Sequence, residues 1–395
     1  MTTTINNEHK KLNVPNLRFP EFQGEWEEYK IEDITENISS GRCKSHSSSG
    51  KYNLYGSTGI IGKTNEACYE GNLVLVARVG ANAGSLQIIN EPCGITDNTL
   101  IIKPKEVDAQ YIFYFLQHLN LNRLIFGSGQ PLITGGMLKK VKVSLGTIQE
   151  QNKLTRLLSL LDKRIATQNK IIEDLKKLKS AIIEKVFCSP NQECPICRVE
   201  GFEQTLTTYK MNDFCSRIAT KNKDSKCSLV LTIAAQYGLV NQESFFNKSV
   251  ASENLTGYYL LHKGEFAYNR SYSAGYDWGA VKRLDNYDEG VLSTLYICFK
   301  INETIVESDY LAYYFESTKW HRGLSDIAGE GARNHGLLNV SMTDYFNTKH
   351  RFPVIEEQKA IVKMLNAITE KERKATLLGE CYQKQKQYFL RQMFI

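Results

Sequence analysis

The sequence predicts a mixed α/β protein in which two globular domains in tandem repeat are separated by two long helices. We expect these helices to pair within the chain as an antiparallel coiled coil. Three observations lead to this fold class. Short patterns recur in the same order in both halves, two segments of about 40 residues carry heptad repeats, and the segments before them mix strand-like with helical runs. A chain of 395 residues has room for two to three domains of roughly 150 residues.

The internal repeat is weak in identity but constant in order. Four matched pairs carry it: 29–34 with 209–214, 71–78 with 264–270, 111–116 with 310–315, and 148–151 with 355–358. The last offset, 207 residues, holds without a gap as far as Phe187 and Phe394. The offset changes inside the domains, which indicates loops of different length. The helices therefore keep a fixed length while the domains vary.

The repeat gives a domain order. We predict a tail at 1–14, a first domain at 15–147, a helix at 148–190, a second domain at 191–354 with a linker at its start, and a second helix at 355–395. Within the domains, strand-like patterns lie at 73–77, 99–102, 266–268 and 292–299, and helical patterns at 107–124 and 308–320. Glycine-rich loops at 127–136 and 329–333 precede each long helix. This alternation predicts mixed α/β domains.

The two long helices carry apolar residues at heptad spacing, which is typical of a coiled-coil seam. No Gly or Pro interrupts the first, whereas Gly379 lies in the second and costs about 1 kcal/mol relative to Ala. The predicted seam consists of Leu154, Leu158, Leu161, Ile165, Ile172 and Leu175 in the first helix, and of Ile361, Leu365 and Ile368 in the second.

Neither helix can bury its seam alone, because each is polar outside it. Two matched copies of equal length favour pairing within one chain; the alternative is a coiled coil that joins two chains. Forty residues at a rise of 1.5 Å span roughly 60 Å. An intrachain pair would thus hold the two domains at its opposite ends.

The net charge of +6 is concentrated in the helices. Residues 148–187 hold nine Lys/Arg against five Asp/Glu, and residues 355–394 hold eight against five, which leaves the remainder at −1. A polyanionic partner would therefore meet local basic patches in the domains rather than a broad positive field.

Composition also bears on location and redox state. No apolar run approaches the roughly 20 residues of a membrane helix, and the first residues are polar, so we expect a cytoplasmic protein. Its ten cysteines should then be reduced. Cys194 and Cys197 have the spacing of a zinc ribbon, but no second close pair follows. We favour an inert linker over a zinc or redox site and predict no metal.

Motifs for catalysis are missing from the sequence. Residues 59–64 resemble the end of a phosphate-binding loop, but Ser57 stands where the first glycine is needed. We interpret this segment as a surface turn that could lie on DNA. The sequence has no nucleophile elbow, zinc-protease motif, Asn-Pro-Pro-aromatic methyltransferase motif or glycine-rich cofactor fingerprint. We therefore predict no catalytic residue and no cofactor in this chain.

DNA-binding proteins use Arg and Lys for phosphates and guanine edges, and Asn, Gln or Ser for other bases, mostly on loops. The candidates in the first domain are Arg42, Lys44, Ser45, Lys51, Tyr55, Ser57, Lys63, Arg78, Asn82, Ser128 and Gln130. Those in the second domain are Lys221, Asn222, Lys223, Asn269, Arg270, Tyr272, Lys282, Arg283, Arg333, Asn334 and His335. Any one of them is more often a solvated surface residue, and Arg78 and Arg270 are equally well explained as buried structural arginines. As sets they indicate a nucleic-acid interface.

Several of these segments resemble a known family. Residues 17–22 with Trp26 and 29–30, residues 55–62, and the Ile-x-Glu-Gln starts of both helices are similar to the DNA-specificity subunits of type I restriction-modification systems. The similarity extends over nearly the whole chain. Two departures stand out: the linker 188–201, and the lack of a second Pro-x-Phe-x-Gly-x-Trp. They leave the start of the second domain open.

The resemblance implies that each domain recognises one half of a split target in double-stranded DNA and that the helices set the spacer between the halves. It implies two methyltransferase subunits and motor-nuclease subunits as partners. S-adenosylmethionine, ATP and magnesium would serve these partners in adenine methylation and ATP-dependent cleavage. Two alternatives remain: a coiled-coil scaffold that dimerises and binds only protein, and a phosphate-loop enzyme.

Overall fold

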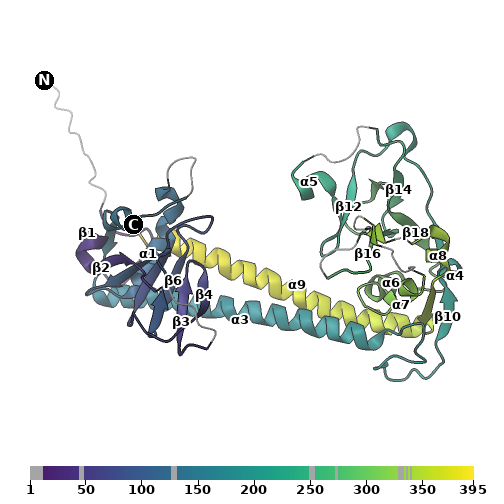
Figure 1. The fold of residues 1–395 in the computed structure, drawn as a ribbon, viewed down its shortest axis with the longest axis horizontal. Helices are drawn as coiled ribbons and strands as arrows, with labels where there is room; N and C mark the ends of the chain where they lie inside the picture. Colours follow the sequence, from purple (N-terminus) through teal and green to yellow (C-terminus); the bar gives the residue numbers. More distant parts are fainter. Residues whose placement is uncertain are drawn as a thin grey trace. The chain divides into compact units, whose positions relative to one another are not determined.

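The computed structural model describes residues 12–43, 49–125, 131–248, 254–271, 275–327, 333–334, 337–338 and 340–395. The chain divides into two compact units, unit 1 (Met1–Lys170 with Thr376–Ile395) and unit 2 (Ile171–Ala375). Two long helices, α3 (Ile148–Val186) and α9 (Ile355–Gln392), each contribute to both units (Figure 1). Within the described residues, neither these nor any other helix has the length and apolarity to cross a membrane.

Unit 1 is built on a four-stranded antiparallel sheet of order β2-β8-β5-β6. These strands are β2 (Thr35–Ser40), β8 (Thr99–Pro104), β5 (Leu73–Ala77) and β6 (Leu86–Ile89). All five residues of β5 are buried, as expected for a central strand. Three more strands form a second sheet, β4-β3-β7: β4 (Gly59–Thr64), β3 (Tyr52–Gly56) and β7 (Cys93–Ile95). The strand β1 (Glu27–Lys30) pairs with β9 (Lys142–Leu145).

The helices of unit 1 cover the large sheet. Helix α1 (Ala109–Leu119) begins after Asp108, whose side chain accepts a hydrogen bond from the Gln110 amide and so caps the helix. Helix α2 (Gly135–Lys139) and the short turns η1 (Ile31–Ile34) and η2 (Leu121–Leu124) complete the unit.

Unit 2 repeats this plan. Its four-stranded sheet has the order β11-β18-β15-β16, from β11 (Cys215–Arg217), β18 (Ile297–Ile301), β15 (Phe266–Asn269) and β16 (Ala280–Arg283). The strand β10 (Thr207–Lys210) pairs with β21 (Lys349–Phe352), as β1 does with β9. The remaining pairs are β12 (Leu231–Ala234) with β13 (Gly238–Asn241), β14 (Tyr259–His262) with β17 (Glu289–Leu292), and β19 (Arg333–Asn334) with β20 (Leu337–Leu338). Its short helices are α4 (Met211–Phe214), η3 (Lys223–Ser225), α5 (Gln242–Phe246), α6 (Ser308–Tyr314), α7 (His321–Ser325) and α8 (Met342–Asn347).

The prediction of a single strand at 292–299 is wrong. The structure has two strands there, β17 ending at Leu292 and β18 beginning at Ile297, with a turn between them. The turn is closed by a hydrogen bond from the Tyr296 amide to the Ser293 carbonyl. Likewise, the predicted helix 308–320 consists only of α6, and α7 follows as a separate helix.

The long helices pack against each other in opposite directions. In unit 1, Leu154 and Leu158 near the start of α3 share a core with Met393 and Phe394, which directly follow α9. In unit 2, residues at the end of α3 share a core with Ile361 and Leu365 near the start of α9. This order makes the pair antiparallel, as predicted.

The predicted seam is buried over most of its length. Leu154, Leu158, Leu161 and Ile165 are buried, as are Ile361 and Leu365. Ile172, Leu175 and Ile368 are only partly buried. Helix α3 ends at Val186, a few residues before the predicted 190, and Gly379 does not interrupt α9.

The cores of the two units differ at one matched site. Unit 2 places His350 opposite Tyr209 in its short sheet, where unit 1 places Val143 opposite Tyr29. The His350 ring is 2% exposed and lies between the Tyr314 hydroxyl, 3.0 Å away, and the Thr348 hydroxyl, 2.8 Å away. Burial disfavours the charged imidazolium and lowers the pKa of His350 to about 3.

This histidine should make unit 2 sensitive to acid. The folded pKa lies below the unfolded value near 6.5, so the unfolded state binds the extra proton and stability falls as pH drops below about 6.5. The expected loss from this group is about 2 kcal/mol between roughly pH 7.5 and roughly pH 5. Denaturant unfolding of the full chain at both values should show a smaller loss in His350→Val, which restores the unit 1 residue. Equal losses in variant and parent would refute this role of His350.

Candidate nucleic-acid interface

In each unit, a buried glutamate in the first turn of a long helix binds an arginine from the segment that precedes the first strand of the unit. In unit 1, Glu150 of α3 accepts hydrogen bonds from Arg18 Nε at 2.7 Å, Arg18 Nη2 at 2.8 Å and Trp26 Nε1 at 3.1 Å. The glutamate side chain is 3% exposed. A side chain at Gly146 would collide with both Glu150 and Trp26, so the glycine permits this close approach. The arginine in turn donates to the carbonyls of residues 23 and 24, which holds the N-terminal segment in place.

Unit 2 has the same joint with one partner fewer. Glu357 of α9 accepts from Arg198 Nε at 2.9 Å and Arg198 Nη2 at 2.7 Å. Glu357 follows Glu150 by the helix offset of 207 residues, and Arg198 follows Arg18 by 180. Leu206 stands at the place of Trp26 and is buried. Unit 2 therefore uses the arginine but not the tryptophan of this joint.

A backbone hydrogen bond places the start of the second repeat. The Leu17 amide donates to the Gln392 carbonyl at the end of α9, and the Cys197 amide donates to the Lys185 carbonyl near the end of α3, both at 2.9 Å. The two bonds match at the offsets of 180 and 207 residues. The segment around 197–198 in the predicted linker is therefore the structural counterpart of 17–18.

An aromatic residue just beyond the end of one long helix packs into the core of each unit. Phe394, just beyond α9, lies 5.3 Å from Tyr111 and 6.3 Å from Phe115 between ring centroids. Phe187, just beyond α3, lies 5.0 Å from Tyr310 and 5.7 Å from Tyr314. Each domain core is thus completed by an aromatic residue that follows the long helix of the other repeat.

The candidates in unit 1 divide into exposed and internally bonded residues. Arg42, Lys51 and Asn82 are exposed. In contrast, the Tyr55 hydroxyl donates to Glu91 Oε1 at 2.7 Å and Lys63 Nζ donates to Asn53 Oδ1 at 2.7 Å. Burial, and then the hydrogen bond to Glu91, raises the pKa of Tyr55 to about 12. Tyr55 and Lys63 therefore stabilise the small sheet as well as lying near its surface.

The remaining candidates of unit 1 lie in different environments. The Ser57 hydroxyl donates to the Asn98 carbonyl at 3.2 Å, and Arg78 is partly buried with a buried Nε that has no partner among the described residues. Residues 59–64 form strand β4 at a sheet edge, so the expected surface turn is wrong there, although Ile60 and Ile61 are exposed. Lys44, Ser45, Ser128 and Gln130 lie outside the described residues.

Three candidates of unit 2 form hydrogen bonds within the unit. Asn222 is 1% exposed. Its side-chain nitrogen donates to the backbone carbonyls of Cys227 and Leu255, and its side-chain oxygen accepts from the backbone N–H of Cys227, so the residue stabilises its own loop. Arg283 is held by Asp285 and Asp309 at 2.6 Å each, and by Ser308. Arg270 donates to the carbonyls of Val340 and Leu295. These side chains are bonded inside the unit, and their role as DNA contacts stays a prediction.

The other candidates of unit 2 lie nearer the surface. Lys223 is exposed, Lys221 donates to the Gly257 carbonyl at 2.7 Å, and Asn269 accepts from the Ser271 amide at 2.9 Å. Lys282 is partly buried. The backbones of Arg333 and Asn334 form β19, but their side chains, like Tyr272 and His335, are outside what the structure describes.

The cysteine pair of the linker gives no metal geometry. Cys194 and Cys197 are both exposed. Across the described ranges, no three His, Cys, Asp or Glu side chains are grouped so as to hold a metal ion.

Part of the chain is similar in sequence to known proteins. Residues 23–177 match the family model for the type I restriction modification DNA specificity domain. The MjaVIII specificity subunit of a type I restriction enzyme of Methanocaldococcus jannaschii is 31% identical over 121 residues, which are 29% of this chain and 28% of the relative. The EcoprrI specificity subunit of Escherichia coli is 25% identical over 131 residues, 33% of this chain and 32% of the relative. These matches cover less than half of the chain.

A solved structure extends the likeness in fold. The crystal structure of a type I restriction-modification S subunit from M. genitalium aligns over 97% of this chain and 99% of that chain, with a TM-score of 0.59 at 15% sequence identity. The two curated relatives are matched over only 28% and 32% of their own length. The family model ends within α3. Beyond residue 177 the likeness to the M. genitalium S subunit is one of fold alone.

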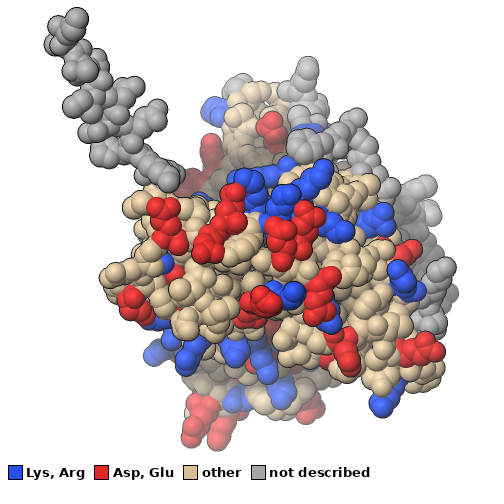
Figure 2. All heavy atoms as spheres, turned by 90° about the vertical axis from the view of Figure 1, so that its left-hand side faces the viewer, with Lys and Arg blue, Asp and Glu red and all other residues tan. Residues whose placement is uncertain are grey.

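The charge of unit 1 is mixed at its surface. Figure 2 shows Lys and Arg side chains interspersed with Asp and Glu on the face it presents. Exposed ion pairs such as Lys103 with Glu36 and Lys142 with Glu28, both 2.7 Å, neutralise part of the basic charge. This face agrees with the expectation that cations act in local patches.

Sequence reasoning missed several residues of the joints and of unit 2. It did not assign Arg18, Glu150, Arg198 or Glu357, although the matching offsets were available in the sequence. It also missed Lys176, which lines a cleft in unit 2 together with the candidate Lys282. The signal for Lys176 is a difference between the repeats, since Gln383 stands at the matched place in α9.

Proposed function

We propose that this chain is the DNA-specificity subunit of a type I restriction-modification complex. Each unit would recognise one half of a bipartite DNA target, and the helix pair would fix the number of unread base pairs between the halves. The observation that carries the proposal is that the two units have the same fold but different surface residues. The same sheet order and the same arginine–glutamate joint recur, whereas the exposed loops differ in length and sequence.

The helices suit a spacer role because their lengths are matched. Helix α3 has 39 residues and α9 has 38, although the units they connect differ in loop length. B-DNA repeats every 34–36 Å, so a fixed separation of two readers would select spacers in phase with the helix. In this proposal the helices act as a ruler and the units as readers.

We propose that the chemistry is carried out by partner subunits and that this chain is not itself an enzyme. Two methyltransferase subunits would use S-adenosylmethionine to methylate adenine, and motor-nuclease subunits would use ATP and magnesium to translocate and cleave DNA. The complex would act in the cytoplasm. The candidates for contacts to double-stranded DNA include the exposed Arg42, Lys51 and Asn82 in unit 1 and, in unit 2, the exposed Lys223 and the partly buried Lys282.

Co-expression with a type I methyltransferase subunit tests this proposal. We expect N6-methyladenine in host DNA at a split motif on both strands, and none when the methyltransferase subunit is expressed alone. Binding of the complex to a duplex with this motif should weaken with salt, as contacts to phosphates require. A complex that assembles but neither methylates a motif nor binds DNA would favour the alternative of a coiled-coil scaffold.

A further inference from the structure

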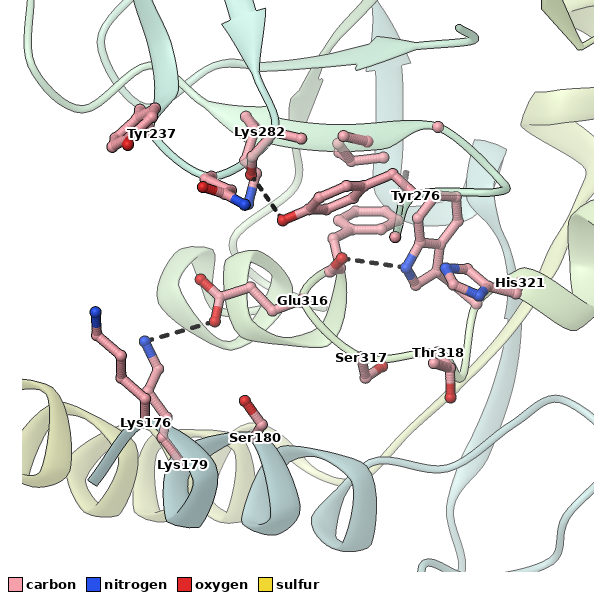
Figure 3. Close-up of a pocket in the computed structure, with 18 of the residues that line it drawn as sticks. Lys176, Lys179, Ser180, Tyr237, Tyr276, Lys282, Glu316, Ser317, Thr318 and His321 are labelled. Atoms are coloured by element: carbon pink, nitrogen blue, oxygen red, sulfur yellow. Dashed lines mark hydrogen bonds and ion pairs between the residues drawn. The ribbon is translucent and has the colours of Figure 1, made fainter. Parts of the chain in front are cut away.

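A cleft of about 740 Å³ lies within unit 2, between its sheet and helix α3 (Figure 3). Lys176, Lys179 and Ser180 project into it from α3, and Tyr237 and Lys282 lie on the opposite side (Figure 3). Tyr237 belongs to the turn between β12 and β13 and is 69% exposed. The cleft therefore joins a long helix to an exposed turn of the recognition unit.

Neither Lys176 nor Lys282 forms an ion pair in the described part of the chain, although Glu316 attracts Lys282 electrostatically. Lys179 lies 3.5 Å from Glu316 and 5.2 Å from the Tyr313 ring centroid. In the described part of the chain, the ammonium groups of Lys176 and Lys282 form no hydrogen bond or ion pair. Burial lowers the pKa of Lys282, because desolvation disfavours its charged form. An anion in the cleft would offset this cost.

Unit 1 shows that these two charges are not needed for the fold. In unit 2, Lys282 of β16 pairs with Ala267 of β15, and Ala267 lies three residues before Arg270. In unit 1, Gln87 of β6 pairs with Leu75 of β5, and Leu75 lies three residues before Arg78. The Ile133 and Leu338 amides, which donate to the carbonyls of Arg78 and Arg270, confirm this match. Gln87 donates to the Gly56 carbonyl at 2.9 Å and so ties the β3–β4 turn to the sheet. Lys282 makes no such bond to a turn among the described residues.

The helix positions repeat the contrast. Lys179 corresponds to Lys386 at the offset of 207 residues, and both ammonium groups lie over a tyrosine ring, at 5.2 Å from Tyr313 and 5.4 Å from Tyr114. This lysine is therefore part of the shared scaffold. Lys176, in contrast, corresponds to Gln383. Lys176 and Lys282, the two cleft lysines without an ion pair among the described residues, therefore both correspond to glutamine in the other repeat.

We propose that this cleft binds phosphate groups of the DNA backbone beside the half-site recognised by unit 2, with Lys282 and Lys176 as the contacts. The inference rests on the proposed function and adds that α3, the predicted spacer helix, itself touches DNA. Lysine ammonium groups contact phosphates without reading sequence. The cleft therefore contributes affinity and position, while the sequence of the half-site is read elsewhere.

The test uses the full chain in complex with its methyltransferase partner and a duplex carrying the mapped motif. Lys282→Gln and Lys176→Gln install the residues of unit 1, and Lys371→Gln, on an exposed residue of α9 outside the cleft, is the matched control. Each cleft variant should weaken binding about tenfold at roughly 0.1 M salt and reduce the slope of log K against log salt by about one. The control should change neither quantity, and the methylated motif should stay the same in all variants.

Three outcomes separate the explanations. Lys282→Arg should bind DNA nearly as the parent does, which guards against a loss caused by misfolding of Lys282→Gln. If the parent complex binds DNA and the salt slope is unchanged in both glutamine variants, the phosphate site is refuted and the proposed function stands. If the variants instead lose the methyltransferase subunit, the cleft is a protein contact and the inference fails. If the parent complex binds no DNA, the proposed function itself fails.

Discussion

Phe187→Ala should destabilise unit 2 by about 3–5 kcal/mol, the usual loss for a large aromatic residue removed from a core. The ring is fully buried and packs edge-on against Tyr310 and Tyr314. Although Phe187 follows the helix of the first repeat, its contacts lie in the second unit. Phe394→Ala should have the reciprocal effect on unit 1, where the ring contacts Tyr111 and Phe115.

Hydrogen exchange read separately for peptides of each unit would measure this crossed pattern. Phe187→Ala should reduce protection in unit 2, and Phe394→Ala should reduce it in unit 1. Phe245→Ala is a suitable control, because this side chain is 44% exposed and its removal should cost little. Loss of protection in unit 1 alone after Phe187→Ala would contradict the packing described here.

Glu150→Leu should destabilise unit 1 by about 2–4 kcal/mol, because the Arg18 guanidinium would lose its carboxylate partner in a site that is 15% exposed. Trp26 would also lose its acceptor. Glu357→Leu should act on unit 2 in the same way, since Arg198 is 22% exposed and bonded to Glu357 by two nitrogen atoms. The Trp26 bond exists only in unit 1, so the Glu150 substitution should cost more.

A double-mutant cycle distinguishes loss of the pair from loss of volume. Arg18→Leu combined with Glu150→Leu removes both charges and should be less destabilising than the sum of the single substitutions. Denaturant unfolding of the four forms gives the coupling free energy. Additive effects would show that Arg18 and Glu150 do not act as a pair.

The sequence was sufficient for the architecture because the repeat and the heptads are local patterns. The constant offset of 207 residues predicted both long helices, and their first residues, Ile148 and Ile355, are those observed. The buried strand β5 also has its predicted bounds, Leu73–Ala77, because a continuous apolar run bounded by turn residues is a strong signal. The turn at 293–296 was missed because its flanking strands are both apolar.

The roles of individual polar residues could not be predicted, because they depend on partners far away in the sequence. In the sequence, Arg283 and Asn222 both look like DNA contacts. In the folded unit, Arg283 forms an ion pair with Asp309, and Asn222 is hydrogen-bonded within its own loop. The reverse holds for Lys282, whose lack of an ion pair among the described residues is visible only in the folded unit. The start of the second repeat was left open because Arg198 keeps its role without the Pro-x-Phe-x-Gly-x-Trp pattern around it.

The central claim is that each unit reads its own half of a split DNA target. The most direct measurement maps N6-methyladenine after residues 15–147 are exchanged for the corresponding domain of another specificity subunit, with the helices and unit 2 left unchanged. One half of the motif should change, while the other half and the spacer length should stay the same. A change in both halves, or no change in either, would contradict this claim.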